Sequence, residues 1–283
     1  MNPDDVDAAY ETASTALYES FEEQERLRNR SREDVERRKD RYRHYLRHDP
    51  EGAWVADAGG RIVGVSNALV REDLWVLSLF AVDRKYRSVG VGRRLLERAM
   101  RHASGTRAAA IASSRHPAAM RSYARAGFDL HPSFEAKGPV RRSSLPSGLR
   151  MREGEERDLE LAAEVDRAVR GAAHGPDLDL MLEADTRLLV SDTPTGRGYA
   201  VEWRGSPAIV AATDPAIAQQ LLWACLALAP ADEPVEINWI TGRQNWAVPV
   251  ALDAGLSLAP YGPICTRGAV GPMTPYIPSG PYL

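Results

Sequence analysis

The two halves of the chain carry predicted strands and helices in the same order. In the first half, the strand-like segments "GAWVAD", "RIVGVSNALV" and "LWVLSLFAV" are separated by short polar turns, which favours an antiparallel meander. A helix, the strand "RAAAIASS" and the helix "HPAAMRSYARAG" follow. The second half repeats this order with unrelated residues and ends in "PAIVAAT", "PAIAQQLLWACLALA", "PVEINWI" and "NWAVPVALDAG". An order of elements that recurs without recurring residues predicts a duplicated fold.

The segment "KGPVRRSSLPSG" between the halves is rich in Pro, Gly and Ser, so it is the best candidate for a linker. We predict a first domain over residues 1–138, a linker over 139–148 and a second domain over 149–283. A chain of 283 residues is long for one core and suits two. The expected fold class is α/β (α+β), with two tandem domains that each have a mixed, mostly antiparallel central sheet flanked by helices.

Two helices are expected in the first fifty residues. The first has apolar residues at three- and four-residue steps, namely Val6, Tyr10, Ala13, Leu17 and Phe21. The second begins at a capping box formed by Ser31 and Asp34. The charge run from Glu22 to Arg43 is interpreted as a solvated face. A nucleic-acid arm is the weaker alternative, because acids interrupt the bases throughout.

Composition excludes several classes of protein. No run of about 18 apolar residues exists to span a bilayer, and the acidic start "MNPDDVDAAYETAS" does not resemble a secretory signal, so a cytoplasmic protein is expected. A net charge of −3 gives no electrostatic case for nucleic acid as a partner. Cys225 and Cys265 lie in apolar stretches without metal-ligand spacing, so buried thiols and no metal site are expected.

The segment "YRSVGVGRRLLERAM" joins a strand to an amphipathic helix through two glycines. The first amides of a helix have no partner within the helix and attract anions. Gly90 and Gly92 let a phosphate approach these amides without meeting a Cβ, and Arg87 adds a positive charge just before them. Arg93 and Arg94 extend that charge. The pattern alone is weak, and neither GxxxxGK[ST] nor GxGxxG with its distant acid is present.

The wider context is more specific. The string "LFAVDRKYRSVGVGRRLLERA" with "HPAAMRSYARAGF" resembles the GNAT superfamily of acetyl-CoA-dependent N-acetyltransferases over about residues 3 to 136. The resemblance implies that acetyl-CoA is the acyl donor and that no metal takes part. It implies that its pyrophosphate is bound by the loop residues Arg87, Ser88, Val89, Gly90, Val91, Gly92 and Arg93. It also implies that the pantetheine arm pairs with the backbone of the preceding strand at Phe80, Ala81 and Val82.

The same resemblance gives Tyr123 the role of stabilising or protonating the departing thiolate. A phenol with a pKa near 10 is able to donate that proton at neutral pH; a core tyrosine is the alternative. His116 replaces the asparagine that the family often has before this helix, and is either a helix cap or a titrating group near the substrate. The sequence identifies no base for the amine. Glu72 and Asp73 are near in sequence, yet they are more simply solvated turn residues.

The second half lacks the corresponding features. Asp214 stands where the first half has its glycine loop, and an aspartate there caps its own helix and repels a phosphate. Leu252 occupies the position that corresponds to the tyrosine, and Leu256 the position that corresponds to the phenylalanine. The second domain is therefore expected to be a degenerate GNAT-like copy without a cofactor site, packed against the first. The tail "GPMTPYIPSGPYL" is either draped on the surface or inserts Tyr276 or Tyr282 into a cleft.

The expected function is transfer of an acetyl group from acetyl-CoA to a primary amine by direct attack, without a covalent enzyme intermediate. A small-molecule amine is preferred over a protein N-terminus or lysine as the partner, and neither nucleic acid nor membrane is expected. A catalytically silent acyl-CoA sensor and a scaffold are the alternatives. The acceptor, the acyl chain length and the choice between monomer and homodimer stay open. Every functional expectation depends on free backbone amides around Val89 to Gly92.

Overall fold

The computed structural model describes residues 1–18, 25, 27–183 and 185–283. It divides into two compact units, which we describe separately: unit 1 comprises Met1–Val70 and Trp75–Thr106, and unit 2 comprises Arg71–Leu74 and Arg107–Leu283. This division falls before the strand at residue 108 and not within the predicted linker over 139–148. The linker prediction concerns the boundary between two copies of a fold, and it stays a prediction. No helix in the described part of the chain is long and apolar enough to cross a membrane.

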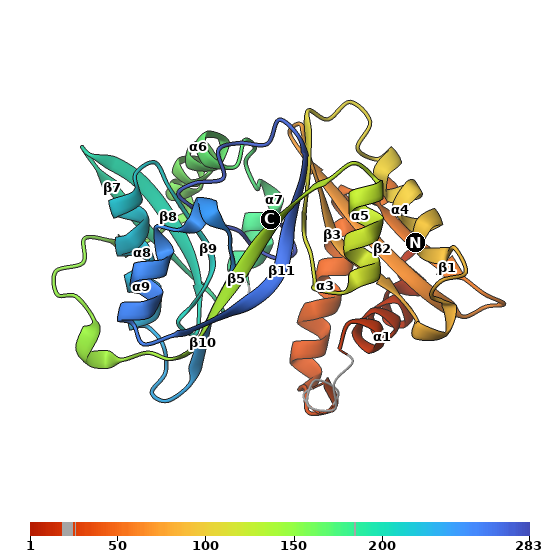
Figure 1. The fold of residues 1–283 in the computed structure, drawn as a ribbon, viewed down its shortest axis with the longest axis horizontal. Helices are drawn as coiled ribbons and strands as arrows, with labels where there is room; N and C mark the ends of the chain where they lie inside the picture. The colour runs from red at the N-terminus through yellow and green to blue at the C-terminus, as the bar shows by residue number, and fades with distance from the viewer. Residues whose placement is uncertain (19–24, 26, 184) are drawn as a thin grey trace. The chain divides into compact units, whose positions relative to one another are not determined.

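Unit 1 places helices on both faces of three antiparallel strands (Figure 1). The strands are β1 (Ala53–Asp57), β2 (Ile62–Arg71) and β3 (Leu74–Val82), and Ala53 of β1 pairs with Asn67 of β2. Helices α1 (Val6–Leu17) and α3 (Arg32–His48) share an apolar cluster with Val65, Leu79 and Ala81 on one face. Helix α4 (Val91–Arg101) contacts the other face, where a side chain at Gly64 would meet Leu95.

The two N-terminal helices form where the sequence predicts them. Helix α1 buries Val6, Ala9, Ala13 and Ala16 at helical spacing, while Phe21 lies outside the described residues. Ser31 caps α3 by accepting a hydrogen bond from the amide of Asp34 at 3.1 Å, which confirms the predicted start of the helix.

Unit 2 contains a sheet in which the two halves of the chain exchange strands. Its strands are β4 (Ala108–Ala112), β5 (Asp129–Pro139), β10 (Pro234–Ile240) and β11 (Ser257–Gly268), in the order β4-β11-β5-β10. Helix α5 (Pro117–Arg125) joins β4 to β5, and helix α9 (Ala247–Asp253) joins β10 to β11. Yet β4 pairs with β11 and β10 pairs with β5, so the last strand of each half completes the sheet of the other half.

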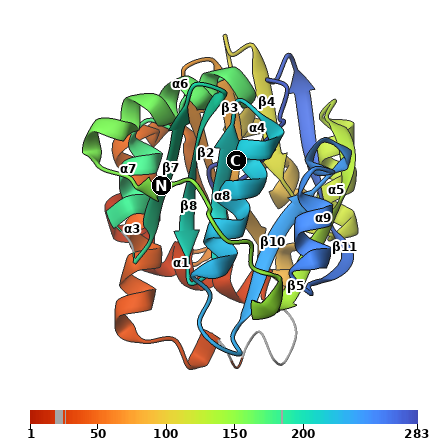
Figure 2. The ribbon, with the colours of Figure 1, turned by 90° about the vertical axis from the view of Figure 1, so that its left-hand side faces the viewer.

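The second sheet of unit 2 belongs to the second half of the chain. It runs in the order β12-β9-β8-β7-β6, with the strands β6 (Arg152–Glu153), β7 (Arg187–Thr193), β8 (Gly196–Trp203), β9 (Ser206–Ala212) and β12 (Tyr276–Ile277). Helix α8 (Pro215–Ala227) lies along β8 and β9 (Figure 2). Helices α6 (Leu159–Val169) and α7 (Pro176–Glu183) precede the sheet. Within the described residues, both halves contain three consecutive strands followed by a helix, a strand, a helix and a strand.

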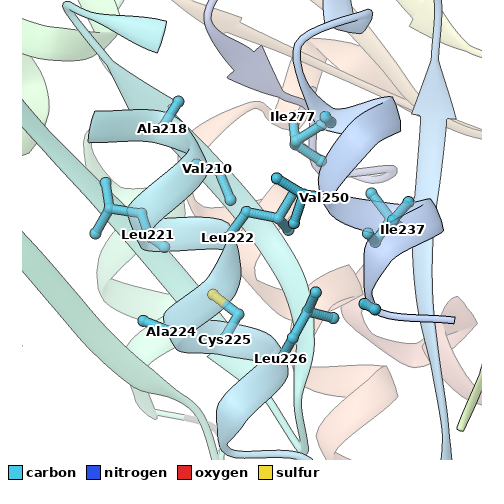
Figure 3. Close-up of a cluster of buried hydrophobic side chains, with 14 of the residues drawn as sticks. Val210, Ala218, Leu221, Leu222, Ala224, Cys225, Leu226, Ile237, Val250 and Ile277 are labelled. Atoms are coloured by element: carbon cyan, nitrogen blue, oxygen red, sulfur yellow. The ribbon is translucent and has the colours of Figure 1, made fainter. Parts of the chain in front are cut away.

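The core of unit 2 centres on α8. Its buried residues Leu221, Leu222 and Cys225 pack with Val250 of α9 and Ile277 of β12 (Figure 3). Because α8 is apolar on most of its surface, neighbours must cover it on several sides. Burial raises the pKa of the Cys225 thiol, and raises that of Cys265 to about 12, so both cysteines are the inert buried thiols that the sequence predicts.

Candidate functional site

The loop between β3 and α4 presents unbonded backbone amides. Gly90 caps the helix with φ at +91°, a left-handed conformation that favours glycine, and Ser88 has φ at +65°. The first helical bond runs from the amide of Arg94 to the carbonyl of Gly90. Residues 87–90 form a turn, and apart from the bonds of that turn no acceptor among the described residues stands in hydrogen-bond geometry to the amides of residues 88–93. Val89 at the tip is 71% exposed, so these amides face solvent and are able to receive an anion.

Gly92 brings the first turn of α4 against the end of β3. A Cβ added at Gly92 would lie 3.4 Å from Cζ of Phe80 and 3.6 Å from Cγ2 of Val82. A Cβ there would make ordinary van der Waals contacts, which shows that the first turn of α4 packs directly on the end of β3. The structure thus brings the loop close to the strand segment Phe80–Val82. The family resemblance assigns the loop to the pyrophosphate of acetyl-CoA and the strand segment to its pantetheine arm. The binding roles of these residues stay predictions.

Arg87 braces the loop through its side chain. Its Nε donates to the carbonyl of Val82 at 3.0 Å, and its Nη2 donates to the carbonyl of Ala16 on α1 at 2.9 Å. The positive charge of the Arg87 guanidinium lies next to the loop in sequence, but two of its N–H groups donate to carbonyls of the protein. Arg93 is more exposed and pairs with Glu97 one turn later at 3.1 Å. The sequence suggested the charge of Arg87 but not its bracing contacts.

Strand β3 contains an irregularity that sequence reasoning missed. Trp75 donates to the carbonyl of Ala99 on α4, whereas Leu79 packs in the cluster of α1 and α3 on the opposite face. Residues four apart share a face of a regular strand, so one extra residue is inserted between them. The Ser78 hydroxyl hydrogen-bonds to the Tyr45 hydroxyl on α3, which places Ser78 on the same face as Leu79. Consecutive residues on one face mark a β-bulge at Ser78–Leu79.

A groove of unit 1 beside α1 does not suit phosphates. It has a volume of about 770 Å³ and is lined by α1, the β1–β2 turn and the segment after β3. Five carboxylates line it, against three basic side chains: Asp4, Asp5, Glu11, Asp57 and Asp83 against Arg61, Arg84 and Lys85. Of these bases, Arg61 is already paired with Asp83 at 2.8 Å. The amides at the start of α4 are therefore the better anion site of this unit.

Tyr123 lies on α5 in unit 2. It is 4% exposed, and its ring meets that of Phe128 edge-on with 6.5 Å between centroids. Burial raises the pKa of its phenol well above 10.0, with a smaller contribution from Cys265, so the hydroxyl is protonated at neutral pH. This protonation state suits a proton donor. A core tyrosine would show the same burial, so its catalytic role stays a prediction.

His116 is a helix cap. Its Nδ1 accepts from the amide of Ala118 at 3.2 Å, and Pro117 occupies the first helical position. Of the two alternatives for His116, the structure confirms the cap.

Glu72 and Asp73 form ion pairs in their turn. Glu72 pairs with Arg167 at 2.7 Å, and Asp73 pairs with Arg107 at 2.8 Å. All four residues belong to unit 2. Arg107 is the largest cause of a lowered pKa of the Asp73 carboxyl. The lowered pKa makes the Asp73 carboxylate a poor base, and the Glu72 carboxylate is held in its ion pair with Arg167, so we assign proton removal from the amine to neither residue.

The second half differs from the first at both expected binding elements. Asp214 caps α8 by accepting from the amides of Ala216 at 2.8 Å and Ile217 at 3.4 Å, which confirms that it fills the place of an external anion. The tail covers the free edge of β9, where Tyr276 pairs with Ala211 and the amide of Ala212 donates to Pro275.

Two expectations about the second half are wrong. The amide of Phe128 bonds to the carbonyl of Tyr123, and the amide of Leu256 bonds to that of Ala251, so the counterpart of Tyr123 is Ala251 and not Leu252. Leu252 is 51% exposed, whereas Ala251 is buried. The tail is neither draped nor inserted into a cleft, because it adds a strand to the sheet and buries Tyr276 completely. The sequence error was an offset of one residue, which the shared Gly before Phe128 and Leu256 would have corrected.

The described residues contain no group of three His, Cys, Asp or Glu that is placed to hold a metal ion. Sequence reasoning did not suggest Tyr45, Ser78 or Asn67. Asn67 is fully buried in β2, and neither polar atom of its side chain has a hydrogen-bond partner within the described structure. The pair Ser66–Asn67 inside a mostly apolar strand was the available signal.

Residues 14–128 match the model of the acetyltransferase (GNAT) family. This segment of the chain runs from α1 through the glycine loop and ends at Phe128 after α5. No curated protein is similar enough to the chain to serve as a relative.

Several solved structures have the same fold. A candidate acetyltransferase from Pyrococcus horikoshii is 17% identical with a TM-score of 0.76, over 100% of this chain and 93% of that one. A GCN5-related N-acetyltransferase from Kribbella flavida is 14% identical with a TM-score of 0.58, over 95% and 70%. A tandem GNAT protein from the clavulanic acid biosynthesis pathway is 14% identical with a TM-score of 0.53, over 94% and 96%. At these identities the likeness establishes the fold alone.

Proposed function

We infer that this chain, which belongs to the GNAT acetyltransferase family through residues 14–128, transfers an acetyl group from acetyl-CoA to a small primary amine. The observation that carries this proposal is the row of open amides at residues 88–93 beside Arg87. A diphosphate carries enough charge and acceptor oxygens to satisfy several of these amides at once. The fold and family support acyl transfer from an acyl-CoA, and the acetyl group and the amine are the finer parts of the proposal.

The donor is held along two elements of unit 1 in this mechanism. The amides of the loop bind the pyrophosphate, and the charge of Arg87 adds attraction while its side chain keeps the loop in place. The backbone at Phe80–Val82 bonds to the pantetheine arm. A bulge interrupts the regular ladder of a strand, and in this mechanism a backbone amide at Ser78–Leu79 polarises the thioester carbonyl.

The reaction needs no covalent intermediate, because the thioester is already activated. The amine attacks the carbonyl carbon, the C–N bond forms, the C–S bond breaks, and the thiolate of coenzyme A takes a proton from Tyr123. The amine must lose a proton, and Glu72 and Asp73 are both held in ion pairs with arginines. Water is therefore the simplest acceptor of that proton.

Release of free thiol from acetyl-CoA in the presence of amines tests the proposal, together with calorimetric titration of coenzyme A. We expect coenzyme A binding and amine-dependent thiol release. Binding without release for any amine would identify a silent acyl-CoA sensor instead. An absence of binding would leave a scaffold and refute both.

A further inference from the structure

A buried asparagine of unit 1 makes no hydrogen bond through its side chain. Asn67 of β2 is fully buried, and neither its Oδ1 nor its Nδ2 has a hydrogen-bond partner within the described structure. A buried polar group without a hydrogen bond destabilises the fold, and such groups are rare in native proteins. Asn67 therefore needs an explanation other than the stability of unit 1.

Asn67 and Ser78 lie opposite each other on β2 and β3. A two-residue turn at residues 72–73 joins these strands, with Asn67 five residues before it and Ser78 five residues after it. Residues at equal distances from such a turn pair across the hairpin, share a face and have Cβ atoms about 4.5–5.5 Å apart. Asn67 shares a face with Val65, which packs with α1 and α3. Ser78 is on that face too, because it hydrogen-bonds to Tyr45 of α3.

This position places the carboxamide beside the reacting group of the proposed mechanism. In that mechanism, a backbone amide of the bulge at Ser78–Leu79 polarises the thioester carbonyl. Neighbouring strands are about 4.8 Å apart, so a side chain of β2 that lies opposite the bulge is within one strand spacing of it. An acceptor that approaches the carbonyl over the face of α1 and α3 therefore meets Asn67.

The second half of the chain has the same position without an unpartnered group. A two-residue turn at residues 204–205 joins β8 to β9, so Tyr199, five residues before that turn, corresponds to Asn67. Tyr199 is fully buried, and its hydroxyl donates to Asp166 of α6 at 2.6 Å. The half whose donor elements are blocked thus satisfies this polar side chain from within the protein. The half with the open loop does not.

The chemistry of a carboxamide defines the group that would satisfy it. Its oxygen accepts hydrogen bonds and its nitrogen donates them, and it carries no charge. A ligand that satisfies both atoms must bring a donor and an acceptor close together. The nitrogen of a primary amine is such a donor, and a hydroxyl or carbonyl oxygen is such an acceptor.

We propose that Asn67 binds the acyl acceptor, with Oδ1 accepting a hydrogen bond from the amine and Nδ2 donating to an oxygen on a neighbouring carbon. The acceptor is then a primary amine that carries a hydroxyl or carbonyl oxygen close to its nitrogen, such as an amino alcohol. This inference rests on the proposed function. The bond to Oδ1 orients the amine toward the thioester carbonyl, and no proton passes to Asn67, because a carboxamide is not a base at neutral pH.

Variants of two adjacent residues test this role. Asn67→Leu replaces the carboxamide with an apolar group of the same branching, and Asn67→Ala removes it without adding bulk. Ser66→Ala is the matched control, because Ser66 is also fully buried and its hydroxyl also has no partner within the described structure. Ser66 faces the opposite side of β2 with Gly64, where a Cβ would meet Leu95 of α4.

The kinetic assay uses the amine with the highest wild-type turnover in the thiol-release screen. A buried hydrogen-bonding group that is left unsatisfied weakens binding by roughly fivefold to 150-fold. We expect both Asn67 variants to raise KM for the amine by about this factor, while KM for acetyl-CoA and the Kd of coenzyme A stay the same. Ser66→Ala should leave all three constants unchanged. It should melt at or above the wild-type temperature, because its hydroxyl makes no bond within the protein.

A pair of amines tests the acceptor class. Ethanolamine and propylamine have the same number of heavy atoms and differ in a hydroxyl against a methyl group. We expect the ratio of their kcat/KM values, ethanolamine over propylamine, to fall in Asn67→Leu relative to the wild type. Comparing the two ratios cancels the difference in intrinsic reactivity between the amines.

Three outcomes overturn the inference. A wild-type KM for the amine in both Asn67 variants would do so, and so would an equal rise of this KM in Ser66→Ala. A ratio of ethanolamine to propylamine that is the same in the wild type and Asn67→Leu would overturn the acceptor class. Failure of the proposed function looks different, because the wild-type protein itself would then release no thiol with any amine.

Discussion

The glycine at the start of α4 allows the clearest test of the phosphate loop. Gly90 has φ at +91° and Gly105, beyond the far end of the same helix, has φ at +85°. An added Cβ at either position meets nothing within 4 Å, so alanine at either site introduces backbone strain alone. Left-handed backbone costs alanine about 1–2 kcal/mol, partly offset by the reduced freedom of the unfolded chain. We therefore expect Gly90→Ala and Gly105→Ala to destabilise the protein equally, by about 1 kcal/mol.

Only one of the two variants should change donor binding. Alanine at residue 90 shifts the backbone out of the left-handed region and turns the neighbouring amides away from the phosphates. Losing one charge-assisted hydrogen bond costs about 1.5–3 kcal/mol, which raises Kd by roughly tenfold to 150-fold. Thermal melts should show the same fall of about 2–4 °C for both variants. Titration calorimetry with coenzyme A should show weaker binding for Gly90→Ala alone. Unchanged binding in that variant, or an equal loss in both, would refute the loop as the pyrophosphate site.

Other changes separate chemistry from stability. Tyr123→Phe keeps the ring but removes the proton donor, so turnover should fall by about 10²-fold or more with an unchanged Kd for coenzyme A; normal thiol release would exclude the tyrosine from the mechanism. Asp214→Ala removes the cap of α8 and should cost about 1 kcal/mol in a denaturant melt without altering coenzyme A binding. Arg152 lowers the pKa of the Asp158 carboxyl from 3.8 to about 2, so its stabilising effect is complete above the unfolded pKa and disappears as the pH falls toward 2. Acid titrations of Arg152→Gln and the wild type should therefore differ at neutral pH and converge below about pH 2.

Features that depend on neighbouring residues were predictable from the sequence. The Ser31 cap, the Asp214 cap and the strand-loop-helix around Gly90 are each decided within a few residues. The order of elements, and with it the tandem fold, also followed from local patterns of apolar and turn residues.

Features that depend on distant pairing were not predictable. The exchange of β5 and β11 between halves requires Ser257 to meet Lys137 across a gap of more than a hundred residues, and no local pattern specifies that partner. The bulge at Ser78–Leu79 is equally invisible, because "LWVLSLFAV" is apolar on both faces and its alternation gives no register.

In the second half of the chain, protein atoms occupy the strand edge and the helix start that correspond to the proposed donor site of the first half. In the second half, the carboxylate of Asp214 occupies the first amides of α8, and the tail bonds to β9 at Ala211 and Ala212. Strands β3 and β9 each follow a two-residue turn, and counting from those turns Ala212 of β9 corresponds to Phe80 of β3. The tail therefore bonds to the part of β9 that corresponds to the pantetheine-binding part of β3 in the proposed function. Removing Asp214 alone therefore cannot create a second donor site, because the strand would still be paired. The second half is therefore blocked at both elements, and its strand β11 pairs with β4 and β5 of the first half.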